Sequence, residues 1–160
     1  MPDVASAGAV EEAEDLARVQ KLFGGRQMLG RTVKTQFEAH ELLNDGLKAK
    51  ALDYLVRKKI VHVPQEDVFK AIGISERTYQ RQRKLPERSL NSDQSGRAWK
   101  FAEMLSEATS IFGSQTEAER WLERPALGLN RQRPIDLLTT SAGRRLVATF
   151  LTRLKYGVYT

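Results

Sequence analysis

The stretch "FKAIGISERTYQRQRK", Phe69 to Lys84, decides how the fold is interpreted, because a glycine separates an apolar helical pattern from a basic one. Two short helices that cross steeply need a turn residue that tolerates a left-handed backbone, and Gly73 suits that position. Ser75 follows where a hydroxyl can cap the second helix. The stretch therefore predicts a helix-turn-helix.

Apolar residues around Gly73 have the spacing of a small core shared by the two helices. We expect these to be buried: Val68, Ile72, Ile74 and Tyr79. Phe69 departs from the usual motif, in which a small alanine faces the second helix, and a phenyl ring there splays the helices unless the packing adapts. An ordinary solvated basic helix after a glycine turn is the alternative interpretation.

The outward positions of the second helix have side chains suited to DNA. Arginine and glutamine can form paired hydrogen bonds with guanine and adenine edges. The candidates for the major groove are Ser75, Glu76, Arg77, Gln80, Arg81 and Lys84. Arg83, Lys84 and Arg88 are better placed for phosphates. A dimer is then expected, with its recognition helices about 34 to 36 Å apart.

Composition narrows the class of protein. With 160 residues, 41% of them hydrophobic, the chain can form one domain or two small helical ones. It has no cysteine, which excludes disulfides, thiolate metal sites and cysteine nucleophiles. No apolar run approaches the roughly 20 residues that cross a bilayer, and the N-terminus lacks the pattern of a signal peptide. We expect a soluble, cytoplasmic protein without a membrane partner.

Charge is distributed unevenly along the chain. Five acidic residues and no basic ones precede Arg18, so the rest carries +11, the total of +6 minus the leader's −5. A strongly basic body indicates a polyanionic partner, although solubility alone can produce the same balance.

Nearly all of the remaining signals are helical. Residues 1–9 are expected to be disordered, and a helix with a glycine stop follows. Residues 60–63 are expected to be a connector or at most an isolated strand. The last helix is predicted at 141–156, burying Leu146, Val147, Phe150, Leu151 and Leu154. Gly25, Gly30, Arg31 and Thr32 have the spacing of a phosphate-binding loop, but arginine replaces the lysine and no strand precedes, so we attribute the spacing to chance.

From Phe37 to the end, about three quarters of the chain, the ordered features resemble the Xre/MbcA/ParS antitoxins of type II toxin-antitoxin systems. The segments that carry the resemblance are "GISERTYQRQRK", "FGSQTEAERWLERPALGL", "RPIDLLTTSAGRRLV" and "FLTRLKYGVYT". Positions matching the family's C-terminal pattern are Trp121, Leu122, Pro125, Leu127, Gly128, Pro134, Leu137, Leu138, Gly143 and Gly157. Two segments depart from it: "LGLNRQRP" replaces a glycine pair followed by Thr-Pro, and "RLKYG" replaces a more acidic run.

The resemblance implies an all-α protein in which an N-terminal Xre-like helix-turn-helix region precedes a helical toxin-binding domain. We expect residues 1–36 to be an acidic leader with a possible helix, 37–88 to bind DNA and 89–160 to bind toxin. Such an antitoxin represses its own promoter and neutralises a RES-domain toxin that depletes NAD. It is no enzyme and has no cofactor. Its partners are the toxin, operator DNA and a second copy within a toxin-antitoxin hetero-oligomer.

The C-terminal tip is the candidate toxin-binding element. Residues after Gly157 cannot belong to the helix core, yet they place an aromatic and an aliphatic side chain beside a basic helix end. We predict that the last helix and tail cover the entrance to the toxin's NAD site. The toxin-binding candidates are Arg144, Arg145, Arg153, Lys155, Tyr156, Gly157, Val158 and Tyr159. A frayed terminus and solvated arginines are the alternative, and Trp121 and "PIDLL" are expected to be core.

Other functional classes have less support. His40 and His62 are the only histidines and have no neighbour at ligand spacing, and no set of nucleophile, base and orienting group is found, so neither an enzyme nor a metal site is predicted. Two alternatives stay open. The chain can be a dimeric helix-turn-helix transcriptional regulator without a toxin, its C-terminal helices serving dimerisation. It can also be an antitoxin that has lost DNA binding, for which Phe69 is the only hint.

Overall fold

The computed structural model describes residues 4–157, which form helices joined by short loops, with no strand in that range. The α-helices are α1 (Val4–Leu22), α2 (Arg26–Leu29), α3 (Gln36–Asp45), α4 (Ala49–Tyr54), α5 (Gln65–Ile72), α6 (Glu76–Arg83), α7 (Ser92–Phe112), α8 (Gln115–Leu122), α9 (Pro134–Leu137) and α10 (Ser141–Lys155). A π-helix, η1 (Leu55–Lys59), continues α4, and a 3-10 helix, η2 (Leu127–Leu129), follows α8. The predicted all-α class is confirmed.

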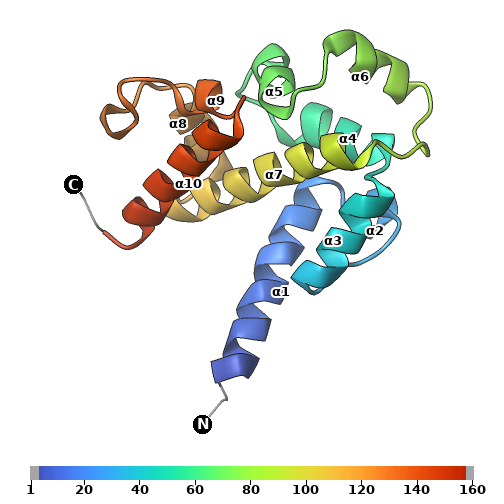
Figure 1. The fold of residues 1–160 in the computed structure, drawn as a ribbon, viewed down its shortest axis with the longest axis horizontal. Helices are drawn as coiled ribbons and strands as arrows, with labels where there is room; N and C mark the ends of the chain where they lie inside the picture. The colour runs from blue at the N-terminus through green and yellow to red at the C-terminus, as the bar shows by residue number, and fades with distance from the viewer. Residues whose placement is uncertain (1–3, 158–160) are drawn as a thin grey trace.

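Helix α7 is the centre of the molecule. Asn91 and Gln94 form a reciprocal capping box at its start, and Gly113, with a φ of 91°, ends it. Helices α1, α3, α5, α8 and α10 all pack against α7. Figure 1 shows α1 and α3 below α7, α5 and α6 above it, and α10 beside its left end.

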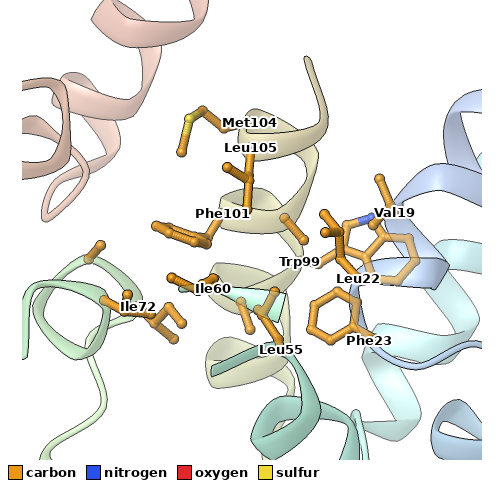
Figure 2. Close-up of a cluster of buried hydrophobic side chains, with 14 of the residues drawn as sticks. Val19, Leu22, Phe23, Leu55, Ile60, Ile72, Trp99, Phe101, Met104 and Leu105 are labelled. Atoms are coloured by element: carbon orange, nitrogen blue, oxygen red, sulfur yellow. The ribbon is translucent and has the colours of Figure 1, made fainter. Parts of the chain in front are cut away.

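A single cluster of buried hydrophobic side chains extends from Leu16 to Leu151. The ring of Trp99 stacks on Phe23 with centroids 5.6 Å apart, and Figure 2 shows Val19 and Leu22 beside them. Phe101 and Met104 point to the other side of α7 (Figure 2). Because both sides of α7 are buried, this helix joins the N-terminal and C-terminal helices through one core.

Two expectations about helices are wrong. Helix α1 already begins at Val4, so residues 4–9 are helical, while residues 1–3 lie outside the described part of the chain. Residues 6–11 are exposed, so the alanines' high helix propensity, and not packing, accounts for this extension. Leu146 is 56% exposed, because the buried stripe of α10 is formed by Gly143, Val147 and Leu151, and Leu146 lies on its flank.

The other local predictions fit the structure. Residues 60–63 are a connector, although the preceding change from α-helix to π-helix at Leu55 was not predicted. Helix α2 lies within the glycine-spaced segment and helix α1 precedes it, so this segment is not the strand-loop-helix of a phosphate-binding loop.

Candidate functional site

The turn between α5 and α6 has the geometry of a helix-turn-helix. Gly73 is left-handed, with φ 75° and ψ 33°, and its N–H donates to the Phe69 oxygen at 2.8 Å. The Ser75 hydroxyl accepts from the Thr78 N–H at 3.1 Å and caps α6. From α7, Arg97 Nε donates to the Ile72 oxygen at 2.6 Å, which anchors the turn to the central helix.

The small core between α5 and α6 forms as predicted, with Val68, Ile72, Ile74 and Tyr79 all buried. Phe69 does face the second helix, and its ring packs on Tyr79 with centroids 4.8 Å apart and the planes tilted by 42°. The Tyr79 hydroxyl donates to the Asp53 carboxylate in α4. Burial, followed by this hydrogen bond, raises the pKa of Tyr79 above its ordinary value. The packing has thus adapted to the phenyl ring.

All eight candidate DNA-binding side chains are exposed: Ser75, Glu76, Arg77, Gln80, Arg81, Arg83, Lys84 and Arg88. Arg83 differs from the others because its Nε lies 3.3 Å from an Asp53 oxygen, and Arg57 shares that carboxylate at 3.6 Å. Asp53 therefore holds the flank of α6 against α4. The side chains of Arg77 and Arg81 remain available on the outward face, where the Gln80 oxygen accepts from Arg83 at 3.3 Å.

The loop after α6 is fixed to the start of α4. Glu87 pairs with Lys48 at 2.9 Å and also with Lys50. The Arg88 oxygen accepts from the Ala49 N–H at 2.8 Å. Hydrogen bonds from the two lysines lower the pKa of Glu87 from 4.5 to about 2. These contacts fix the direction in which the chain leaves α6.

Aromatic rings form the centre of the C-terminal helices. Trp121 of α8 lies between Phe112 and Phe150, with centroid distances of 5.2 and 6.0 Å. Trp121 is half-buried, while Ile135 and Leu138 are fully buried, so the prediction that Trp121 and "PIDLL" serve packing is confirmed.

Most of the candidate toxin-binding residues that the structure describes lie on the exposed side of α10. Arg145, Arg153, Lys155, Tyr156 and Gly157 are exposed, and Tyr156 reaches 70%. Arg144 is half-buried and donates to the Leu138 oxygen at 3.1 Å, so part of its side chain has a structural role. Val158 and Tyr159 lie outside the described residues.

Comparisons with known proteins agree with this arrangement. A sequence model of the antitoxin Xre-like helix-turn-helix domain matches residues 38–103, and a model of the antitoxin Xre/MbcA/ParS C-terminal toxin-binding domain matches residues 107–157. The antitoxin Xre of Pseudomonas putida is 25% identical over 160 residues, which cover 95% of this chain and 98% of that relative. The chain belongs to the Xre/MbcA/ParS antitoxin family.

On the structure, the helix-turn-helix match extends from α3 into α7, and the toxin-binding match runs from the end of α7 to the end of α10. The two parts of this antitoxin-family chain are joined by polar contacts. Glu119 accepts from the backbone N–H groups of Val61 and His62, and Gln115 donates to the Lys59 oxygen at 2.6 Å. Arg133 lies 3.6 Å from Asp67 of α5.

Sequence reasoning missed several residues that shape these surfaces. Asp53 was not singled out, because its partners are distant in sequence. The spacing of Glu117 and Glu119 indicates solvated or capping carboxylates, but Glu119 is buried, because it accepts hydrogen bonds from the distant Val61 and His62. Leu127 was treated only as a position of the family pattern, yet it is 83% exposed. Asn130 and Arg131 both have positive φ. Of this set, Asn130 alone gave a local signal, since asparagine tolerates left-handed backbone.

Within residues 4–157 no helix is long and apolar enough to span a membrane. His40 and His62 are both exposed, and the described residues contain no group of three or more histidine or acidic side chains arranged for a metal ion.

Proposed function

We propose that this chain is an antitoxin that neutralises a cognate RES-domain toxin, an enzyme that depletes NAD, and that it represses its own operon by binding operator DNA. The end of α10 and the tail cover the toxin's active site. The chain itself acts by binding and not by catalysis, in the cytoplasm. A homodimer within a toxin-antitoxin hetero-oligomer presents two α6 helices to the operator.

The observation that carries the toxin half of the proposal is the exposed basic end of α10. Arg153, Lys155 and Tyr156 project there, at the end of the segment matched by the toxin-binding domain. Lys155 Nζ lies 5.7 Å from the centroid of the Tyr156 ring. An aromatic ring beside cations suits insertion into a pocket that binds a phosphate-containing substrate such as NAD.

The DNA half is supported by the outward face of α6. Gly73, Ser75 and Arg97 fix the turn, and the Phe69 ring packs without exposing the shared core. An outward face with Arg77, Gln80 and Arg81 matches the hydrogen-bonding needs of base edges. The boundary near residue 88 between the DNA-binding and toxin-binding parts stays a prediction. Helix α7, which follows this boundary, packs against helices of both parts.

Truncation tests the role of the tail. Deleting residues 157–160 should weaken inhibition of NAD consumption by the RES-domain toxin from the same operon, because the inserting tip is lost. Operator binding by the truncated protein, measured in parallel, should be unchanged and serves as the folding control. Inhibition equal to that of the full chain would show that the tail does not cover the active site.

A further inference from the structure

The loop between α8 and α9 holds an unusual backbone. Ala126 and Gln132 form an isolated antiparallel bridge, and the Ala126 oxygen accepts from the N–H groups of Leu129 and Arg131. Asn130 and Arg131 have φ of 55° and 61°, in the left-handed region that side chains with a Cβ rarely adopt. Asparagine tolerates this conformation, but arginine does not favour it. The strain at Arg131 persists only where surrounding contacts impose it, and such strain is frequent at binding sites.

This backbone turns two neighbouring leucines in opposite directions. Leu129 is buried, whereas Leu127 is 83% exposed. Between them, Gly128 lies flush on α10: a Cβ at this position would be 2.2 Å from Phe150 Cε2. The loop is therefore pressed against α10 and presents Leu127 to its surroundings.

A groove of about 370 Å³ lies between this loop and α10. Gly128 of the loop and Phe150 of α10 line it, together with Leu146, which is 56% exposed. Arg145, which directly precedes Leu146, also lines it, and so does Arg153, two turns farther along the helix. Exposed leucines beside a shallow apolar groove are a feature of protein interaction sites.

The charge of this region identifies the kind of partner. Residues 124–160 contain seven arginines and lysines but one acidic residue, Asp136, so their net charge of +6 equals that of the whole chain. Asp136 is already paired with Arg133 at 2.8 Å. Among the described residues, Arg131, Arg145 and Arg153 form no ion pair. The cations around the groove are thus available to carboxylates of a partner.

We propose that the loop 126–132 and the groove along α10 form a toxin-docking surface, separate from the tail, that receives an apolar side chain flanked by carboxylates on the RES-domain toxin. This inference rests on the proposed function. Leu127 and Leu146 favour a protein partner over DNA, because a phosphate backbone offers no apolar surface to bury. Leu146 lies ten residues before Tyr156, about 15 Å along the helix, so the apolar docking contact is separate from the tip of the tail, and Arg153 lies between the two.

If this surface docks the toxin, substitutions can change affinity for the toxin separately from inhibition of its NAD consumption. Leu127→Ser and Leu146→Ser should each raise the Kd for the toxin about tenfold, because each removes an apolar contact at the interface. Deletion of residues 157–160 should instead leave much of the affinity for the toxin and weaken inhibition. Both leucines are exposed, so their replacement should leave the melting temperature unchanged.

The experiment is titration calorimetry of the full-length chain and its variants against a catalytically inactive form of the RES-domain toxin from the same operon. Leu85→Ser, at an exposed leucine after α6, is the matched control and should bind as the parent does. Parental toxin affinity in both the Leu127 and Leu146 variants would overturn the docking surface while leaving the proposed function intact. If the Leu127 and Leu146 variants lost affinity for operator DNA but kept their affinity for the toxin, the docking surface would also be overturned. Absence of toxin binding by the parent chain would instead overturn the proposed function itself.

Discussion

Glu119 of α8 accepts a hydrogen bond from the backbone N–H of Val61 at 2.8 Å, across 58 positions of sequence. The same carboxylate oxygen accepts from His62 at 2.9 Å, and Glu119 is only 2% exposed. The connector before α5 is thus held by a residue of the toxin-binding domain. Because buried carboxylates are stable only when fully hydrogen-bonded, this contact ties the two functional parts together.

Glu119→Ala should lower the free energy of unfolding by about 1 to 3 kcal/mol, because it leaves two backbone donors without their acceptor. Urea unfolding at neutral pH measures the change. Glu117→Ala is the control on the same helix, since Glu117 is exposed and pairs with Arg120 only at the surface, and its effect should stay within about 0.5 kcal/mol. Equal effects of the two substitutions would contradict the assigned role of Glu119.

Phe69→Ala should destabilise the protein by about 3 to 5 kcal/mol, because it removes a buried ring that packs on Tyr79. Other helix-turn-helix motifs usually have a small alanine at this position, but in this protein the core is packed around the phenyl ring. Thermal unfolding measures the loss, with Phe37→Ala as the control at an exposed phenylalanine. A more stable Phe69→Ala protein, or one with higher operator affinity, would mean that the ring strains the motif.

Arg81→Ala and Lys84→Ala should weaken operator binding in different ways. If Arg81 reads a base, its removal costs about 1 to 3 kcal/mol of specific affinity, whereas loss of Lys84 should mainly reduce the salt dependence by about one phosphate contact. Operator titrations at several salt concentrations separate the two effects. Identical curves for both variants and the parent would argue against α6 lying in the major groove.

The Glu87 ion pairs make a stability contribution that depends on pH. The pKa of Glu87 is about 2 in the folded protein and 4.5 ordinarily, so the stabilisation is complete above pH 4.5 and is lost as pH falls toward 2. The parent should therefore be more stable than Glu87→Gln at neutral pH, and the difference should vanish near pH 2. Because Glu87 is exposed, high salt should also reduce it. A stability difference between the parent and Glu87→Gln that depended on neither pH nor salt would mean that packing, and not the ion pairs, causes it.

Local signals predicted much of this fold. Gly73 and Ser75 were identified because turns and helix caps depend on residues three or four positions apart. The strained backbone at Arg131 gave no such signal, since arginine is not typical of left-handed conformations.

Contacts between distant segments could not be predicted. Asp53 meets Tyr79 across 26 positions, and only the packing of α6 on α4 brings them together. The exposure of Leu146 was not predicted either: helical periodicity placed it in the buried stripe of α10, but packing buries Gly143, Val147 and Leu151 and leaves Leu146 on the flank. One of the two leucines of the candidate toxin surface was therefore assigned to the core from the sequence.

The most direct test of the central claim is NAD consumption by the RES-domain toxin from the same operon, with and without this chain at equal concentration. The proposed antitoxin function predicts that NAD loss stops when the chain is present. Continued NAD loss with folded chain and active cognate toxin would contradict it, and the chain would then be better described as a helix-turn-helix transcriptional regulator without this toxin partner.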